Sequence, residues 1–305
     1  MATVLEINDT GNLSPYRSGW HDLLAQTEDA SFFQTLEWLE LYWKHYASGK
    51  KLRVLLVMEQ DKLQGIMPLV VQKDKTRVGP MRFLTYPLSA WGSFYGPIGR
   101  DTQRILEAGL NHIRRTPRDW DALELRYVDA EGSDGGATER AMTTSGLKAY
   151  RTSQGVASLI DMQGSWDDYL ASRSKNWRKS FRYWERKLKQ QGEIQFVRYR
   201  PRGEAQGESD PRWDLYDTCE AISQKSWQSV SPDGTTLCHA EIRNFLREVH
   251  AAAARLGAVD MELLLLNGTP LAFGYNYYWD RRLIGLRVGY DPGISATSGA
   301  GSLLK

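Results

Sequence analysis

Cysteine is scarce in this chain, and its scarcity excludes two kinds of architecture. Only Cys219 and Cys238 occur among 305 residues. Their spacing matches no zinc or iron–sulfur motif, and two thiols cannot form the disulfide framework of a small secreted scaffold. We therefore expect no metal site, and two thiols are compatible with a reducing compartment.

Long apolar runs are also missing. No stretch approaches the ~20 apolar residues that a membrane-spanning helix needs. The first 30 residues lack the apolar core of a signal peptide and contain the acidic residues Glu6, Asp9, Asp22, Glu28 and Asp29. We expect a cytoplasmic protein with no transmembrane segment.

An excess of one charge is absent as well. The chain has 39 Lys and Arg residues against 37 Asp and Glu residues, for a net charge of +2. Any surface that attracts an anionic partner must therefore be local. The length indicates two ordinary domains, which we place at residues 1–160 and 161–305. The composition, 41% hydrophobic and 25% charged, is typical of soluble globular proteins.

The clearest structural pattern that is present lies near the end of the chain. Met261–Leu266 is an apolar run, and Asn267-Gly268 follows it, a dipeptide that favours a two-residue hairpin turn because both residues take positive φ. Side chains then alternate with a period of two over Leu271–Trp279 and Ile284–Tyr290, on either side of a polar turn at Asp280–Arg282. The pattern predicts a three-stranded antiparallel meander.

A turn rich in glycine and serine follows the meander, in the sequence GYDPGISATSGAGSLLK, and leads into what we expect to be a helix. Such a turn exposes backbone N–H groups, and the start of a helix adds unpaired N–H groups and partial positive charge. This combination is a site for phosphate, and pyrophosphate is the natural ligand. A loop near the chain end without a ligand is the alternative.

Strands and helices alternate over the rest of the chain and predict an α/β (α+β) fold. The expected helices are 16–26, 35–46, 102–115, 165–171, 172–192, 214–228 and 239–256. The expected strands before the meander are 52–58, 63–71, 81–86, 122–128 and 148–160.

These segments together resemble the GNAT superfamily of acyl-CoA-dependent N-acetyltransferases. The pyrophosphate loop of that family is Gln/Arg-x-x-Gly-x-Gly/Ala; Gly299 and Gly301 match it, whereas Ala296 stands where Gln or Arg is usual. Ser31–Tyr46 (SFFQTLEWLELYWKHY) and Ser172–Gly192 (SRSKNWRKSFRYWERKLKQQG) are similar to a bacterial subgroup that includes CelD-type proteins and is related to Fem-type aminoacyl transferases. The resemblance implies two tandem GNAT-like domains with mixed central sheets flanked by helices.

The resemblance also implies a chemistry, namely acyl transfer from acetyl-CoA to an amine without a metal. It places the pyrophosphate at Ser298, Gly299, Ala300, Gly301 and Ser302, and the thioester carbonyl at the backbone of Leu286, Arg287 and Val288. Asp291 and Glu262 are candidate bases, and Tyr290 is a candidate proton donor. A turn-forming role for Asp291, which precedes Pro292, is the alternative. The expected acceptor-binding residues are Glu220, Trp227 and Tyr277.

One expected helix is strongly basic. Eight Lys and Arg residues occur between Arg173 and Lys189, against Glu185 alone, on a helix whose aromatic residues share one stripe. The basic face is either merely solvated or binds an anion such as the phosphates of CoA, a polyanionic glycan or an acidic membrane surface. A third possibility is tRNA, which we rank below CoA because the chain contains no base-reading module and the pI is only 8.4.

A complete domain of this family would continue past Lys305 through a further helix and strands. We therefore expect the second domain to be truncated and these residues alone not to be fully active. The expected function is N-acyl transfer, in polysaccharide or cell-envelope metabolism. The alternatives are a non-catalytic accessory protein of polysaccharide synthesis and an aminoacyl-tRNA-dependent transferase.

Overall fold

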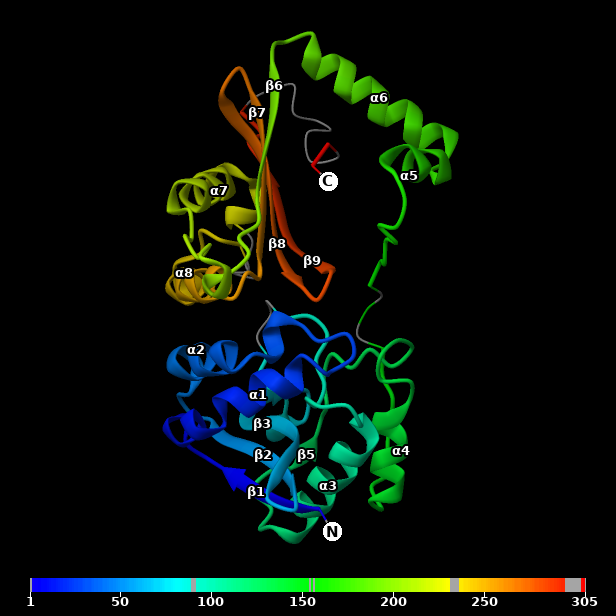
Figure 1. The fold of residues 1–305 in the computed structure, drawn as a ribbon, viewed down its shortest axis with the longest axis vertical. Helices are drawn as coiled ribbons and strands as arrows, with labels where there is room; N and C mark the ends of the chain where they lie inside the picture. The colour runs from blue at the N-terminus through cyan, green and yellow to red at the C-terminus, as the bar shows by residue number, and fades with distance from the viewer. Residues whose placement is uncertain are drawn as a thin grey trace. The chain divides into compact units, whose positions relative to one another are not determined.

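The computed structural model describes residues 2–88, 92–153, 155, 157–230, 236–293 and 303–304. The chain divides into two compact units, Met1–Thr152 with Trp279–Arg282, and Ser153–Tyr278 with Leu283–Lys305. Each unit has its own sheet, with the strand order β1-β2-β3-β4-β5 in the first and β6-β7-β8-β9 in the second. The predicted α/β class is therefore confirmed, with two sheets flanked by helices (Figure 1).

The sheet of the first unit is built around two long central strands. Its strands are β1 (Thr3–Ile7), β2 (Lys51–Glu59), β3 (Lys62–Thr76), β4 (Gly79–Thr85) and β5 (Ala122–Leu123). Each strand is antiparallel to the next except β4 and β5, which run parallel. All residues of 52–57 and 65–71 are buried, so both faces of the central strands are covered, and these strands form the core of the unit.

Helices cover this sheet, and their ends follow the local sequence. They are α1 (Arg17–Leu24), α2 (Leu36–Tyr46), α3 (Thr102–Arg115) and α4 (Ala137–Thr144), with 3-10 turns at Thr10–Tyr16 and Phe32–Gln34. The side chains of Thr35 and Asp101 accept hydrogen bonds from N–H groups at the starts of α2 and α3. The predicted bounds of α3 are confirmed.

The second unit places helices on both sides of its sheet (Figure 1). Its elements are α5 (Trp166–Ser172), α6 (Lys175–Lys189), β6 (Ile194–Tyr199), α7 (Trp213–Lys225), α8 (Ala240–Arg255), β7 (Val259–Leu266), β8 (Thr269–Trp279) and β9 (Arg282–Tyr290), with 3-10 turns at Glu204–Gln206 and Trp227–Val230. α7 and α8 lie against one face of the sheet, and the end of α6 packs on the opposite face.

The predicted meander is confirmed, including both turns. Asn267 and Gly268 have φ values of +50° and +76°, and Asp280 and Arg281 have φ values of +42° and +62°. Both are therefore tight turns whose two central residues have left-handed backbones, which match the twist of paired strands.

Two strand predictions in the first half are wrong. The strand expected at 122–128 is only two residues long, and Tyr127 takes a positive φ of 64°. None of the described residues of the strand expected at 148–160 is in a strand. Exposed side chains such as Tyr150, Leu159 and Ile160 indicate why, because an apolar segment becomes a strand only where a partner strand pairs with it.

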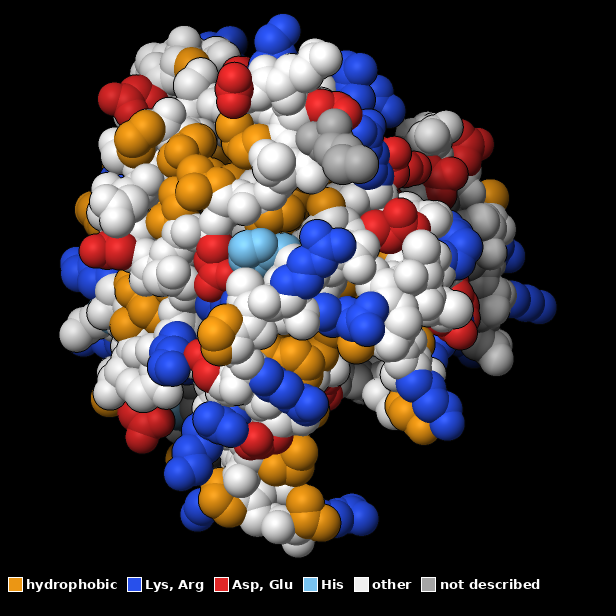
Figure 2. Space-filling model, turned by 90° about the horizontal axis from the view of Figure 1, so that it is seen from below, with side chains coloured by type: hydrophobic (Ala, Val, Ile, Leu, Met, Phe, Trp, Pro, Cys, Tyr) orange, Lys and Arg blue, Asp and Glu red, His pale blue; other side chains and the backbone are white. Residues whose placement is uncertain are grey.

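Among the described residues no helix has both the length and the apolar character required to cross a membrane. Basic and acidic side chains lie interspersed on the face drawn in Figure 2, in keeping with their nearly equal numbers in the sequence.

Candidate functional site

A row of polar side chains crosses the sheet of the second unit on the face opposite α7 and α8. The strand register sets Arg198 of β6 beside Glu262 of β7. It also sets Glu262 beside Gly274, and Asp260 beside Asn276, across β7 and β8. Because directly paired residues point to the same side of a sheet, these side chains share one face. The other face carries apolar and aromatic residues such as Met261, Phe273 and Tyr275.

Asp260 organises this row. Its side chain is fully buried, and one carboxylate oxygen, Oδ2, accepts from Arg198 Nε at 3.0 Å and from Arg200 Nε at 2.6 Å. The other oxygen lies 3.4 Å from Asn276 Nδ2. A buried carboxylate is tolerated only with such partners, so Asp260 fixes the orientation of both arginines.

Glu262 lies two residues further along β7 and is less well satisfied. Its side chain is 10% exposed, and Oε1 lies 3.5 Å from Arg198 Nε. Among the described residues Oε1 has no hydrogen-bond partner. Burial raises the pKa of Glu262 above its ordinary value of 4.5, against the opposing charge of Arg198. A carboxylate with a raised pKa is a better proton acceptor near neutral pH than an ordinary one.

In strand β9 the alternation of side chains between the two faces of the sheet shifts by one residue near the middle. Gly285 and Gly289 are four residues apart, so in a regular strand both would face the same side. A Cβ built on Gly289 would meet the ring of Phe273, whereas one built on Gly285 would face the side chain of Asn276. Phe273 and Asn276 point to opposite faces of β8. The burial pattern loses its alternation at Leu286 and Arg287, where we infer a one-residue irregularity of the β-bulge kind.

The predicted carbonyl-binding residues Leu286, Arg287 and Val288 therefore lie at this phase change. Because β9 is an outer strand of the sheet formed by the described residues, one side of its backbone has no strand partner there and can offer N–H groups. The Leu286 carbonyl accepts from Arg287 Nη1 at 2.6 Å, and burial lowers the pKa of Arg287. This edge suits the carbonyl of a thioester, but its role stays a prediction.

Asp291, the other candidate base, is engaged at the end of β9. Its Oδ2 accepts from Lys225 Nζ at 2.7 Å, and its Oδ1 accepts from the backbone N–H of Gly293 at 2.9 Å. The bond from Lys225 lowers the pKa of Asp291. A carboxylate with a lowered pKa is a weak base, and the bond to Gly293 is that of a turn-forming aspartate. Glu262 is therefore the stronger candidate base.

The predicted pyrophosphate residues, Ser298 to Ser302, lie outside the described residues. On one side the chain is described up to Gly293, and on the other side Leu303 and Leu304 pack on the sheet beside Leu188 of α6. Tyr290 is half-buried and packs against the same apolar cluster, formed by Leu188, Leu264, Leu266, Leu271, Ala272 and Leu303. Its role as a proton donor stays a prediction.

The three predicted acceptor-binding residues occupy different environments. Glu220 on α7 is buried and paired with Arg243 and Arg247 of α8, so it joins the two helices. Trp227 is 66% exposed, and Tyr277 is 1% exposed. Exposure leaves Trp227 accessible to a ligand, whereas Tyr277 lies in the core. No contact of the described residues tests these roles, and all three stay predictions.

A buried histidine lies under the same sheet, and the sequence did not reveal its role. His250 on α8 is fully buried; Nδ1 lies 3.0 Å from the Tyr275 hydroxyl and Nε2 lies 2.6 Å from the Pro211 carbonyl. A carbonyl only accepts, so Nε2 carries the hydrogen and Nδ1 accepts from Tyr275. Burial lowers the pKa of His250 to about 4. The imidazole is therefore neutral and fastens α8 to β8 and to the start of α7.

The basic helix is α6, and its aromatic stripe packs inward as predicted. The Trp177 and Phe181 rings stack at 5.5 Å, and Phe181 meets Trp166 of α5 edge-on. Some of the basic side chains act within the unit: Arg178 donates to the Ala171 carbonyl at the end of α5, and Lys189 pairs with Glu185. An anionic partner for the others stays a prediction.

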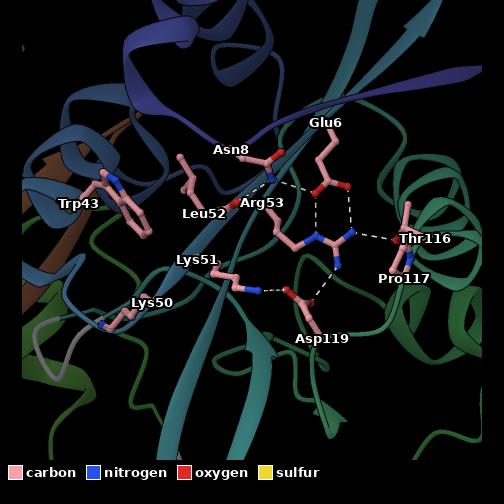
Figure 3. Close-up of a pocket in the computed structure, with 10 residues that line it drawn as sticks. All are labelled: Glu6, Asn8, Trp43, Lys50, Lys51, Leu52, Arg53, Thr116, Pro117 and Asp119. Atoms are coloured by element: carbon pink, nitrogen blue, oxygen red, sulfur yellow. Dashed lines mark hydrogen bonds and ion pairs between the residues drawn. The ribbon is translucent and has the colours of Figure 1, made fainter.

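The first unit contains a cavity of about 500 Å³ around Arg53 (Figure 3). Arg53 Nε and Nη2 donate to the two carboxylate oxygens of Glu6 at 2.8 and 2.9 Å, and Nη2 also donates to Thr116 Oγ1. Burial favours a high pKa for Glu6, but the hydrogen bonds from Arg53, Asn8 and His112 lower it to about 2. These groups satisfy one another, so we regard the cluster as a structural network that joins β1, β2 and α3.

Comparison with known proteins finds a family match in the second unit. Residues 175–305 match the family model of the Acetyltransferase (GNAT) domain. The crystal structure of FemX is similar over 86% of this chain, with a TM-score of 0.50 and 15% sequence identity. The chain spans 58% of the length of that FemX chain, and at this identity the likeness concerns the fold.

A conserved protein of unknown function from Bacteroides thetaiotaomicron VPI-5482 is also similar. The match covers 98% of this chain and 84% of that protein, with a TM-score of 0.43 and 10% identity. No curated protein matches the chain. The family match at residues 175–305 supports the predicted resemblance to GNAT acetyltransferases, and the FemX structure shows a similar fold.

Proposed function

We propose that the GNAT acetyltransferase domain at residues 175–305 makes this chain an acyltransferase that moves an acyl group from a thioester to an amine, with Glu262 as the base. The match to the acetyltransferase family carries the proposal. The nine-tenths-buried Glu262 carboxylate, with one oxygen lacking a hydrogen bond, supplies a group of suitable chemistry in that domain.

The chemistry needs two proton movements and one exchange of bonds. Glu262 takes a proton from the acceptor ammonium, which frees the nitrogen lone pair to attack the thioester carbonyl carbon. The C–N bond forms, the C–S bond breaks and its electron pair goes to sulfur. The second proton lost by the nitrogen ends on the thiolate. Backbone N–H groups near Leu286–Val288 would stabilise the carbonyl oxygen as its negative charge develops.

We further propose acetyl-CoA as the acyl donor, with its pyrophosphate bound at Ser298–Ser302, and an amine from polysaccharide or cell-envelope metabolism as the acceptor. These finer assignments rest on resemblance to the family, because fold alone does not determine a substrate. A non-catalytic accessory protein of the same fold is the alternative. An aminoacyl-tRNA donor ranks lower, since what favours it is the basic face of α6 and a likeness of fold to FemX, and the sequence contains no base-reading module.

Two measurements test the proposal. Calorimetry with acetyl-CoA should give saturable binding, whereas an accessory protein that has lost the reaction would give none. A screen of amines with radiolabelled acetyl-CoA should then yield an acylated product that depends on Glu262. Binding without transfer to any amine in the screen would contradict the proposed activity.

A further inference from the structure

The buried Asp260 orients Arg198 and Arg200 through their Nε atoms. Among the described residues, the terminal nitrogens of both arginines are available to a ligand. Each uses Nε to reach Asp260 Oδ2, and in the described part of the chain neither has a hydrogen bond from its terminal nitrogens. Their side chains are 48% and 33% exposed. The Arg200 guanidinium also lies 3.8 Å above the ring of Tyr278, which fixes its plane. A fixed guanidinium edge suits two-point binding of carboxylate or phosphate.

Glu262 lies directly beside this pair. Arg198 Nε is 3.0 Å from Asp260 and 3.5 Å from Glu262. An anion bound by Arg198 would therefore lie close to the Glu262 carboxylate. Oε1 of Glu262 is buried and lacks a hydrogen bond among the described residues, which is costly unless a ligand supplies a donor. A compact molecule with both an ammonium and an anionic group would satisfy both sites.

Among the described residues, no neighbour crowds two glycines that lie next to these groups. Gly274 is paired with Glu262, and Gly285 lies beside Asn276. Neither has a positive φ. A Cβ added at these positions would come no closer than 3.7 and 3.8 Å to other atoms, an ordinary contact, whereas at Gly289 it would lie 2.4 Å from Phe273. Glycine inside a strand costs roughly 0.5–1 kcal/mol relative to alanine, and it marks a bulge, a bend or the close approach of a ligand or another backbone. Because Gly274 and Gly285 lie on the face that carries Glu262 and Asn276, we favour a ligand here.

We propose that Arg198, Arg200 and Glu262 form an acceptor subsite for a compact zwitterionic amine, such as an α-amino acid or a phosphorylated amino alcohol. The arginines bind the anionic group, Glu262 receives the ammonium, and Gly274 and Gly285 leave room above the sheet. This inference rests on the proposed acyl transfer, and it specifies the class of acceptor.

Binding to four small amines tests the subsite. Glycine supplies a carboxylate, O-phosphoethanolamine supplies a phosphate, and glycinamide and ethanolamine lack the anionic group. We expect glycine, O-phosphoethanolamine or both to bind at least about tenfold more tightly than the counterpart that lacks the anionic group, as for one charge-assisted hydrogen bond. Whichever of the two binds identifies the anion. Equal affinity across the panel would overturn the subsite.

Variants assign this selectivity to the arginines. Arg198→Lys and Arg200→Lys each keep a positive charge near Asp260 but lose the planar guanidinium group that binds an anion at two points. Each should reduce the preference for amines with an anionic group about tenfold. Arg202→Lys is the matched control, because Arg202 is exposed and pairs with Glu208 outside this row. Gly285→Val fills the space from an exposed position and should weaken binding without lowering the Tm. Unchanged selectivity in the two lysine variants, or unchanged binding in Gly285→Val, would refute the assignment.

Different results would contradict the acyltransferase activity and the acceptor subsite. Equal acetyl transfer to glycine and glycinamide, and to O-phosphoethanolamine and ethanolamine, would keep the acyltransferase and overturn the zwitterion subsite. Selective binding of glycine or O-phosphoethanolamine without transfer to any amine would keep the subsite and overturn the acyltransferase.

Discussion

Gly289 and Gly285 are chemically identical residues on one strand, and the structure assigns opposite consequences to replacing them with alanine. A Cβ at Gly289 would lie 2.4, 3.0 and 3.2 Å from three ring atoms of Phe273, which is 1% exposed. Carbon atoms prefer about 3.5–4 Å, so the ring would have to move inside a close-packed core. Overpacking of this kind costs about 1–3 kcal/mol.

At Gly285 the nearest atom that the same methyl group would meet among the described residues is Asn276 Oδ1, at 3.8 Å. Replacing a strand glycine should then stabilise the protein by about 0.5–1 kcal/mol. The two variants should therefore differ by about 2 kcal/mol or more, which corresponds to roughly 5 °C in the Tm of a unit of this size.

Thermal unfolding followed by circular dichroism measures both variants against the parent protein. Gly289→Ala should unfold at a lower temperature than the parent protein, and Gly285→Ala at the same or a higher one. If both substitutions lowered the Tm equally, the two glycines would share one face, and the phase change inferred at Leu286–Arg287 would be wrong.

Three further predictions concern ionisable groups. His250 has a pKa lowered to about 4 by burial, so the unfolded state binds an extra proton below pH 6.5; unfolding free energy should fall by up to about 3 kcal/mol between pH 6.5 and 4, and His250→Gln should remove this part of the slope in urea titrations. Glu6→Gln removes the carboxylate that accepts two hydrogen bonds from the 5%-exposed Arg53 and leaves it the longer 3.6 Å pair with Asp119, which should cost about 3 kcal/mol at pH 7; because the folded pKa of Glu6 is about 2, the stabilisation is full above its ordinary pKa and declines as pH falls towards 2, and a pH-independent loss would contradict this. Asp291→Asn should cost no more than about 1 kcal/mol at pH 7, since Lys225 is 62% exposed; the pKa of Asp291 is lowered, so the difference from the parent protein should be full above the ordinary pKa of aspartate and decline as the pH falls through the lowered pKa, which calorimetric scans at pH 7 and at successively more acidic pH follow.

Local signals in the sequence predicted part of the fold well. The turn at Asn267-Gly268 followed from residue types that tolerate a left-handed backbone, and the turn at Asp280–Arg282 followed from its polar residues between two alternating runs. Helix α3 followed from the spacing of its apolar residues. These features depend on neighbours within a few residues. Such neighbours are visible in the sequence itself.

Features that depend on partners distant in the chain were predicted less well. Residues 148–160 have strand-like composition, but strand formation needs a paired edge, and the described residues there have none. Strand β6 was missed because it lies beside a loop and pairs with β7, which follows more than 50 residues later along the chain. Hydrophobic periodicity carries no information on such pairing.

The candidate site shows the same division. Glu262 was identified by residue type, whereas Asp260, Arg198 and Arg200 were not, because their grouping exists only once the register of β6 and β7 is set. One signal was available: two carboxylates spaced by two residues in the otherwise apolar run VDMELLLL point to one face of a strand. Acidic residues inside an apolar strand require partners, so this run could have indicated the polar row.

The most direct test of the account is the pH dependence of kcat/KM for acetyl transfer by the parent protein and by Glu262→Gln. If Glu262 is the base, the parent protein should lose activity in acid with an apparent pKa above 4.5, the ordinary value for glutamate. The variant should lose this acid limb together with about 10²–10⁴-fold of the rate. A variant with the parental rate and the same acid limb would contradict the central claim.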